Sequence, residues 1–170
     1  MTPFQEEVQT WTDLFTLAGG ASATIIGLLF VAISLRTDIR KAADTSLDRT
    51  VVGHNFFMLL AVLLISIFFM VPEQNPNSLG ISVLITAGIP GYFFTRDLLR
   101  CRHDPALDHS TLLWSFVMPI ICFIVTMAIG VAFIINDDSE ISWFIFVVSM
   151  LLVIPTRSSW DLLMASAEGG

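Results

Sequence analysis

Long apolar blocks alternate with short charged blocks along this chain. The hydrocarbon core of a bilayer is about 30 Å thick, so a helix needs roughly 20 apolar residues to cross it. A lipid-exposed segment must also satisfy its own backbone hydrogen bonds, and these blocks lack the strict alternation of barrel strands. Each block is therefore predicted to be a transmembrane helix. The five predicted spans cover residues 14–35, 52–71, 79–95, 111–135 and 141–156.

The third and fifth blocks are shorter than the others and contain Pro90 and Pro155. We expect both helices to continue beyond the bilayer. Kinks are expected at Pro90-Gly91 and at Pro119, because proline removes a backbone donor and crowds the preceding turn.

The distribution of lysine and arginine tests the number of spans independently. Five spans place every cation on one side of the membrane, which the positive-inside rule assigns to the cytoplasm. The predicted fold is therefore a single all-α membrane domain over residues 1–170. It is a bundle of five transmembrane helices with the N-terminus outside and the C-terminus inside. The eight cations are Arg36, Arg40, Lys41, Arg49, Arg96, Arg100, Arg102 and Arg157.

The composition agrees with a membrane protein and excludes several other classes. Hydrophobic residues make up 55% of the chain and charged residues 14%, against about 25% charged in soluble domains. No phosphate-binding loop, dinucleotide fingerprint, HExxH or Gly-x-Ser-x-Gly motif is present. We therefore predict that the protein is not an enzyme and has no catalytic residues and no cofactor. The sequence has no basic stretch typical of nucleic-acid binding, so we predict no nucleic-acid partner. The apolar composition predicts instead that the protein is surrounded by the lipid bilayer.

The first span carries a narrow stripe of small and polar residues. At about 100° per residue these positions share one helix face, opposite Ile25, Leu29 and Ile33. One interpretation is a helix-packing seam, because membrane interfaces use small residues and hydroxyls. The alternative is a pore lining, in which several copies of this helix surround a narrow channel. The stripe consists of Asp13, Thr16, Gly20, Thr24, Gly27, Val31, Ser34 and Asp38.

The predicted outer surface is acidic and the predicted inner surface is electrically balanced. The net charge of −7 therefore lies outside, where a ring of acidic mouths would concentrate cations. Topology rules explain most of these acids more simply, because they exclude lysine and arginine from the outside but leave acids unconstrained. Asp13 is the exception because it lies on the stripe. The outer acids are Glu6, Glu7, Asp13, Glu73, Asp137, Asp138 and Glu140.

A group of titratable residues lies on the predicted inner side. Its members are of types that ligate metals or titrate near neutral pH, but their spacing matches no zinc motif, and we predict no metal site. Arg96 with Asp97 and Arg157 with Asp161 are interpreted as interfacial anchors rather than a proton relay. The inner group, a candidate pH or metal cluster, is His54, Cys101, His103, Asp104, Asp108 and His109.

Two segments carry a resemblance. WTDLFTLAGGASATIIGLLFVAISL and SSWDLLM resemble the first span and the closing Trp-x-Leu-Leu of a group of small, uncharacterised bacterial multi-pass membrane proteins. Some members bear an automated label as modulators of a membrane-bound AAA protease. The resemblance implies a bacterial inner-membrane protein of about this length and brings no catalytic residues.

Two functions remain open from the sequence. The first is a homo-oligomeric pore or channel-like protein that passes small cations, with the first span lining or sealing the axis. The second is a non-conducting accessory or modulator subunit that docks on a larger membrane complex through the same stripe.

Overall fold

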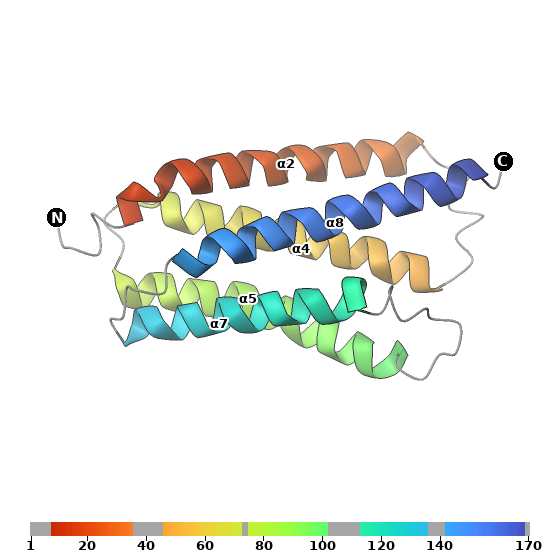
Figure 1. The fold of residues 1–170 in the computed structure, drawn as a ribbon. Coiled ribbons are helices and arrows are strands. Elements are labelled where there is room, and N and C mark those ends of the chain that lie inside the picture. The colour runs from red at the N-terminus through yellow and green to blue at the C-terminus, as the bar shows by residue number, and fades with distance from the viewer. Residues whose placement is uncertain (1–7, 36–45, 73–74, 102–112, 136–141, 169–170) are drawn as a thin grey trace.

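The computed structural model describes residues 8–35, 46–72, 75–101, 113–135 and 142–168. Within these ranges every regular element is a helix, which confirms the predicted all-α class (Figure 1). The elements are α2 (Thr12–Leu35), α4 (Ser46–Met70), α5 (Pro76–Cys101), the π-helical turn η1 (Leu113–Val117), α7 (Met118–Ile134) and α8 (Trp143–Glu168).

Four of these segments are long and apolar enough to cross a membrane. They are Thr12–Val31, Val52–Met70, Pro76–Arg100 and Leu113–Ile134. The apolar part of α8, Trp143–Ser158, is shorter than the other four. The chain therefore has the helical segments of an integral membrane protein.

The proline-containing helices continue past the predicted spans. α5 runs through Pro90 to Cys101, and α8 runs through Pro155 to Glu168, as the sequence predicted. The second half of α5 turns away from α7 in Figure 1. Pro119 occupies the first turn of α7, directly after η1, so its missing amide hydrogen coincides with the change from π-helical to α-helical backbone.

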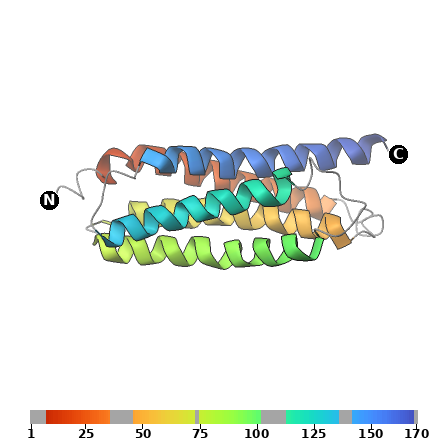
Figure 2. The same ribbon diagram turned by 60° about the horizontal axis from the view of Figure 1, so that its bottom comes forward.

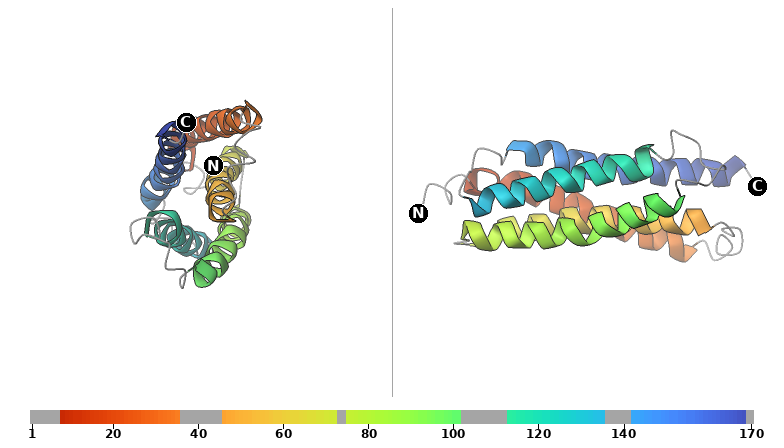
Figure 3. Two further views of the ribbon diagram at one scale, coloured as in Figure 1. Left: turned by 90° about the vertical axis from the view of Figure 1, so that its right-hand side faces the viewer. Right: turned by 90° about the horizontal axis from the view of Figure 1, so that it is seen from below.

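Helix α4 lies at the centre of the bundle. It packs against α2, α5 and α8, while α5 packs against α7 and α7 against α8. Figure 2 and the end-on view in Figure 3 show α2 at the edge, beside α4. Of the residues in the most apolar window of each helix, 50% are buried in α4 but only 17% in α2. Helix α2 thus leaves most of its surface to lipid or to another protein.

Stacked phenylalanines join four helices near the end of the bundle where α2 begins. Phe15 of α2 stacks on Phe69 of α4, with ring centroids 3.9 Å apart. Phe144 of α8 meets Phe69 edge-on at 5.2 Å and stacks on Phe133 of α7 at 6.1 Å. All four rings are buried. Within a bilayer the hydrophobic effect does not drive helices together. Aromatic pairs of this kind therefore stabilise the helix contacts through their preferred ring geometries.

Two close helix crossings depend on glycine. A Cβ added at Gly80 of α5 would lie 2.6 Å from the backbone oxygen of Gly130 of α7. A Cβ added at Gly19 of α2 would lie 2.9 Å from Cβ of Ser66 of α4. The absence of side chains lets these helix pairs approach closely, as small residues do in membrane interfaces.

Candidate functional site: the outer face of α2 and the basic end of the bundle

The side of α2 that packs on α4 is well defined. Phe15, Ala18 and Gly19 are buried there. Ser22 is fully buried on the same side, and its hydroxyl donates a 2.5 Å hydrogen bond to the backbone oxygen of Leu59. The packing seam between α2 and α4 is therefore built on Gly19 and Ser22.

The predicted stripe lies on the opposite side of α2. Successive residues turn by about 100°, so Gly20 and Gly27 point away from the face that holds Ser22. No atom of the described chain lies within 4 Å of a Cβ placed at either glycine, apart from the helix's own nearby backbone. Every described stripe residue is exposed: Asp13, Thr16, Gly20, Thr24, Gly27, Val31 and Ser34. Asp38 lies outside the described residues.

The hydroxyl groups of the stripe donate to their own helix. Thr16 donates to the backbone oxygen of Thr12, Thr24 to that of Gly20, and Ser34 to that of Phe30, each at 2.8 Å. A hydroxyl has one hydrogen to donate and two acceptor lone pairs. The stripe thus offers oxygen acceptors to its surroundings. With the carboxylate of Asp13 at one end, this surface suits cations better than anions.

Apolar side chains border the stripe on both sides. Leu17 is 72% exposed, Leu28 63% and Phe30 56%. A water-soluble protein rarely leaves so much contiguous apolar surface uncovered. The border is suited to acyl chains or to another apolar helix.

The second candidate site lies where α5 and α8 carry Arg96, Arg100 and Arg157, an end of the bundle called here the basic end. His54, in the third turn of α4, is buried there. Its Nε2 lies 3.2 Å from Oδ2 of Asp97 on α5. The sequence put His54 with a titratable group but did not pair it with Asp97.

Aromatic rings hold the imidazole of His54 from two elements. Phe94 of α5 stacks on it with centroids 3.8 Å apart, and Phe116 of η1 meets it edge-on at 5.1 Å. Both rings are fully buried. Arg96 lies 3.4 Å from the other carboxylate oxygen of Asp97. The imidazole of α4 therefore contacts residues of two other segments, α5 and η1.

Two buried polar atoms near this pair have no hydrogen-bond partner among the described residues. They are Nδ1 of His54 and Nδ2 of the neighbouring Asn55. Buried polar atoms of proteins nearly always find a partner, so each unpaired atom calls for an explanation. An ionisable residue within a membrane span, such as His54, is by default a candidate functional site.

Most of the predicted inner cluster cannot be placed. His103, Asp104, Asp108, His109 and the side chain of Cys101 lie outside the described residues. Among the residues that are described, no three His, Cys, Asp or Glu side chains come together as metal ligands. Of the predicted outer acids, only Asp13 is described.

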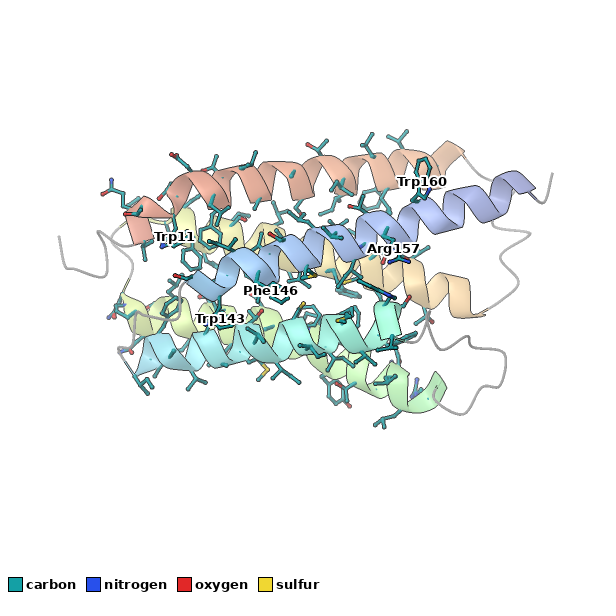
Figure 4. All side chains as sticks on the ribbon, viewed as in Figure 1. Trp11, Trp143, Phe146, Arg157 and Trp160 are labelled. Atoms are coloured by element: carbon teal, nitrogen blue, oxygen red, sulfur yellow. The ribbon has the colours of Figure 1, made fainter. Side chains whose placement is uncertain are left out.

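Tryptophans mark both ends of the bundle. Trp11 and Trp143 lie near one end and Trp160 toward the other, near Arg157 (Figure 4). The guanidinium of Arg157 lies 4.8 Å from the ring centre of Trp114 in η1. Asp161, the predicted partner of Arg157, has no described side chain.

Comparison of the chain with family models, with curated proteins and with solved structures finds no match. The chemistry of both sites therefore rests on their own geometry. One feature of the sequence is consistent with the pairing of His54 and Asp97. Both residues lie at the predicted inner ends of two consecutive spans.

Proposed function

We propose that copies of this protein assemble in a membrane around α2 and form a narrow pathway for small cations. The observation that carries the proposal is the exposed stripe, which faces away from α4; a Cβ placed at Gly20 or Gly27 meets no other described part of the chain within 4 Å. Glycine at positions 20 and 27 would let a neighbouring helix approach closely. Lining by Thr16, Thr24 and Ser34 would supply oxygen acceptors along the axis.

The proposed assembly has five spans per subunit, with the N-terminus outside and the C-terminus in the cytoplasm of a bacterial inner membrane. Tryptophan prefers the interface between lipid and water. Trp143 and Trp160 are 57% and 63% exposed on α8, and 17 residues of helix place them about 26 Å apart along its axis. That separation supports α8 as the fifth span.

The association of copies is tested with two matched leucine substitutions. Gly20→Leu on the stripe should convert a homo-oligomer into monomers without unfolding it, because no other described residue lies within 4 Å of its Cβ. Gly88→Leu on α5 is the control, since its Cβ also meets nothing within 4 Å. Detergent-solubilised mass, measured by light scattering on a sizing column, should fall for the first variant alone. A wild-type monomer, or equal mass for both variants, would reject assembly through the stripe.

Conduction is tested on reconstituted protein of verified oligomeric state. Val31, 54% exposed on the stripe, would form the tightest apolar ring, where a pore can close by dewetting. Val31→Ser should therefore leave the pathway open and raise the resting current. An intact oligomer that carries no current over a range of voltage, pH and tension would instead favour the accessory subunit, which docks through the same stripe.

A further inference from the structure

We propose that His54 and Asp97 form a proton-operated clasp that fastens the second half of α5, residues 91–101, to α4. The inference stands independently of cation conduction, because it concerns the contact between two helices of one subunit. It begins from the 3.2 Å contact between Nε2 of His54 and Oδ2 of Asp97. The contact bridges 43 residues of sequence and ties α4 to α5 at the basic end.

Protonation changes what this contact can do. A neutral imidazole has one donor and one acceptor nitrogen, whereas an imidazolium has two donors and a positive charge. The charged form would make a charge-assisted hydrogen bond to the carboxylate of Asp97. It would also gain a cation–π attraction from the ring of Phe94, whose centroid lies 3.8 Å from that of the imidazole. A bound proton therefore favours the closed contact over an open one.

The pair is more open at Asp97 than at His54. The side chain of His54 is 6% exposed, but that of Asp97 is 20% exposed. A proton can therefore arrive along the carboxylate without the imidazole leaving its place between Phe94 and Phe116.

Among the side chains that the structure describes, the other charged groups near the clasp belong to α5 and α8. On α5, Arg96 lies 3.4 Å from Asp97 and competes with His54 for its carboxylate. Arg157 of α8 lies over Trp114 of η1, and Arg100 is exposed on α5. The titratable group of α7 is the thiol of Cys122, while η1 carries none. Of these described charged groups, Asp97 is the one whose negative charge can balance a positive charge on His54.

The backbone near the clasp is interrupted on both sides. Pro90, inside α5, cannot donate to the carbonyl one turn earlier, so the helix can bend there. Phe116 belongs to the π-helical turn η1. Turns of this kind are frequent at functional sites and often bend the helix that contains them. In Figure 1 the segment of α5 after Pro90 already diverges from α7. Opening the clasp would free this segment to turn further about Pro90.

The experiment measures the distance between α4 and α5 as the pH changes. Spin labels are placed at Ile67→Cys and Leu99→Cys, which are 47% and 60% exposed, after Cys101 and Cys122 are replaced by alanine. Pulsed electron–electron resonance in lipid nanodiscs then gives the label separation at about pH 5 and about pH 8, the range in which histidine changes charge. We expect one narrow distance at the lower pH and a longer or broader one at the higher pH.

Three variants identify the groups responsible. His54→Gln and the isosteric Asp97→Asn should each abolish the pH dependence, and Asp97→Glu should retain it. His103→Gln combined with His109→Gln is the matched control, because it removes the other two histidines and should leave the pH dependence intact. A distance that does not respond to pH in the parent protein would overturn the clasp. So would a response that survives both His54→Gln and Asp97→Asn, or one that disappears in the double histidine control.

Discussion

Replacing Gly80 by alanine should weaken the bundle because it forces α5 and α7 apart. The new Cβ would lie 2.6 Å from the backbone oxygen of Gly130 and 2.8 Å from Cγ1 of Ile134. Ordinary van der Waals contact begins at 3.4 Å. The distance between the new Cβ and the Gly130 oxygen must therefore lengthen by about 0.8 Å, from 2.6 to 3.4 Å. The side chain of Ile134 can rotate, but the carbonyl oxygen belongs to the α7 backbone. The two helices must therefore separate or tilt.

The cost follows from that displacement. A gap of about 0.5–1 Å loses roughly a quarter to a half of the dispersion energy of each atom pair it opens. Overpacking of this kind typically costs about 1–3 kcal/mol. Alanine also favours a helix over glycine by about 1 kcal/mol, which offsets part of the loss. We expect a net loss of up to about 2 kcal/mol in the free energy of unfolding, or up to roughly 30-fold in the equilibrium constant.

The assay is reversible unfolding in mixed detergent micelles, followed by circular dichroism. Gly88→Ala on the same helix is the matched control, because its Cβ meets nothing within 4 Å and it gains only helix propensity. Gly130→Ala should fall between the two, since its closest contacts are 3.0 Å to Cγ of Leu84 and 3.1 Å to the oxygen of Gly80. If Gly80→Ala unfolds no more readily than Gly88→Ala, the close crossing of α5 and α7 is not a source of stability.

Three further predictions concern α2 and the topology. Ser22→Ala removes the buried hydrogen bond to Leu59 and should lower the free energy of unfolding by about 0.6 kcal/mol, the average for such bonds in membranes; an unchanged unfolding curve would contradict it. In intact cells, membrane-impermeant thiol reagents should label Ser78→Cys but not Ser46→Cys; labelling at position 46 would overturn the five-span topology. Asp13→Asn should lower cation conductance in planar bilayers, most strongly at low salt, because the Debye length falls from about 10 Å at 0.1 M to about 3 Å at 1 M. If the variant and the wild-type protein conduct equally at low salt, Asp13 does not line the pathway.

The helices could be predicted from the sequence because their signal is local. Apolar runs of the right length predict membrane helices without any knowledge of their neighbours. The predicted spans over residues 79–95 and 141–156 already include Pro90 and Pro155, and both helices continue past these spans. Within a membrane the alternative to a helical backbone is an unsatisfied one, so a helix tolerates proline more readily there than in water.

The partners of the helices could not be predicted because they depend on distant residues. His54 and Asp97 are 43 residues apart and meet only because α4 and α5 run antiparallel and cross in the right register. Gly80 and Gly130 are likewise joined by the packing of α5 on α7. Neither glycine belongs to a conspicuous pattern of small residues, so no local signal singles them out.

The two neighbouring glycines of α2 show how one helix can serve folding and association separately. Gly19 lies against Ser66 of α4, so a larger side chain there must disturb the subunit itself. Gly20 is only about 100° farther round the helix, and a Cβ placed there meets no other part of the chain that the structure describes. A helix gains nothing within its own subunit from leaving space at Gly20 and Gly27, and glycine costs about 1 kcal/mol of helix propensity at each. Contacts with a second protein that fills the space would offset that cost. The function of this protein should therefore be tested first on the stripe rather than on the buried seam.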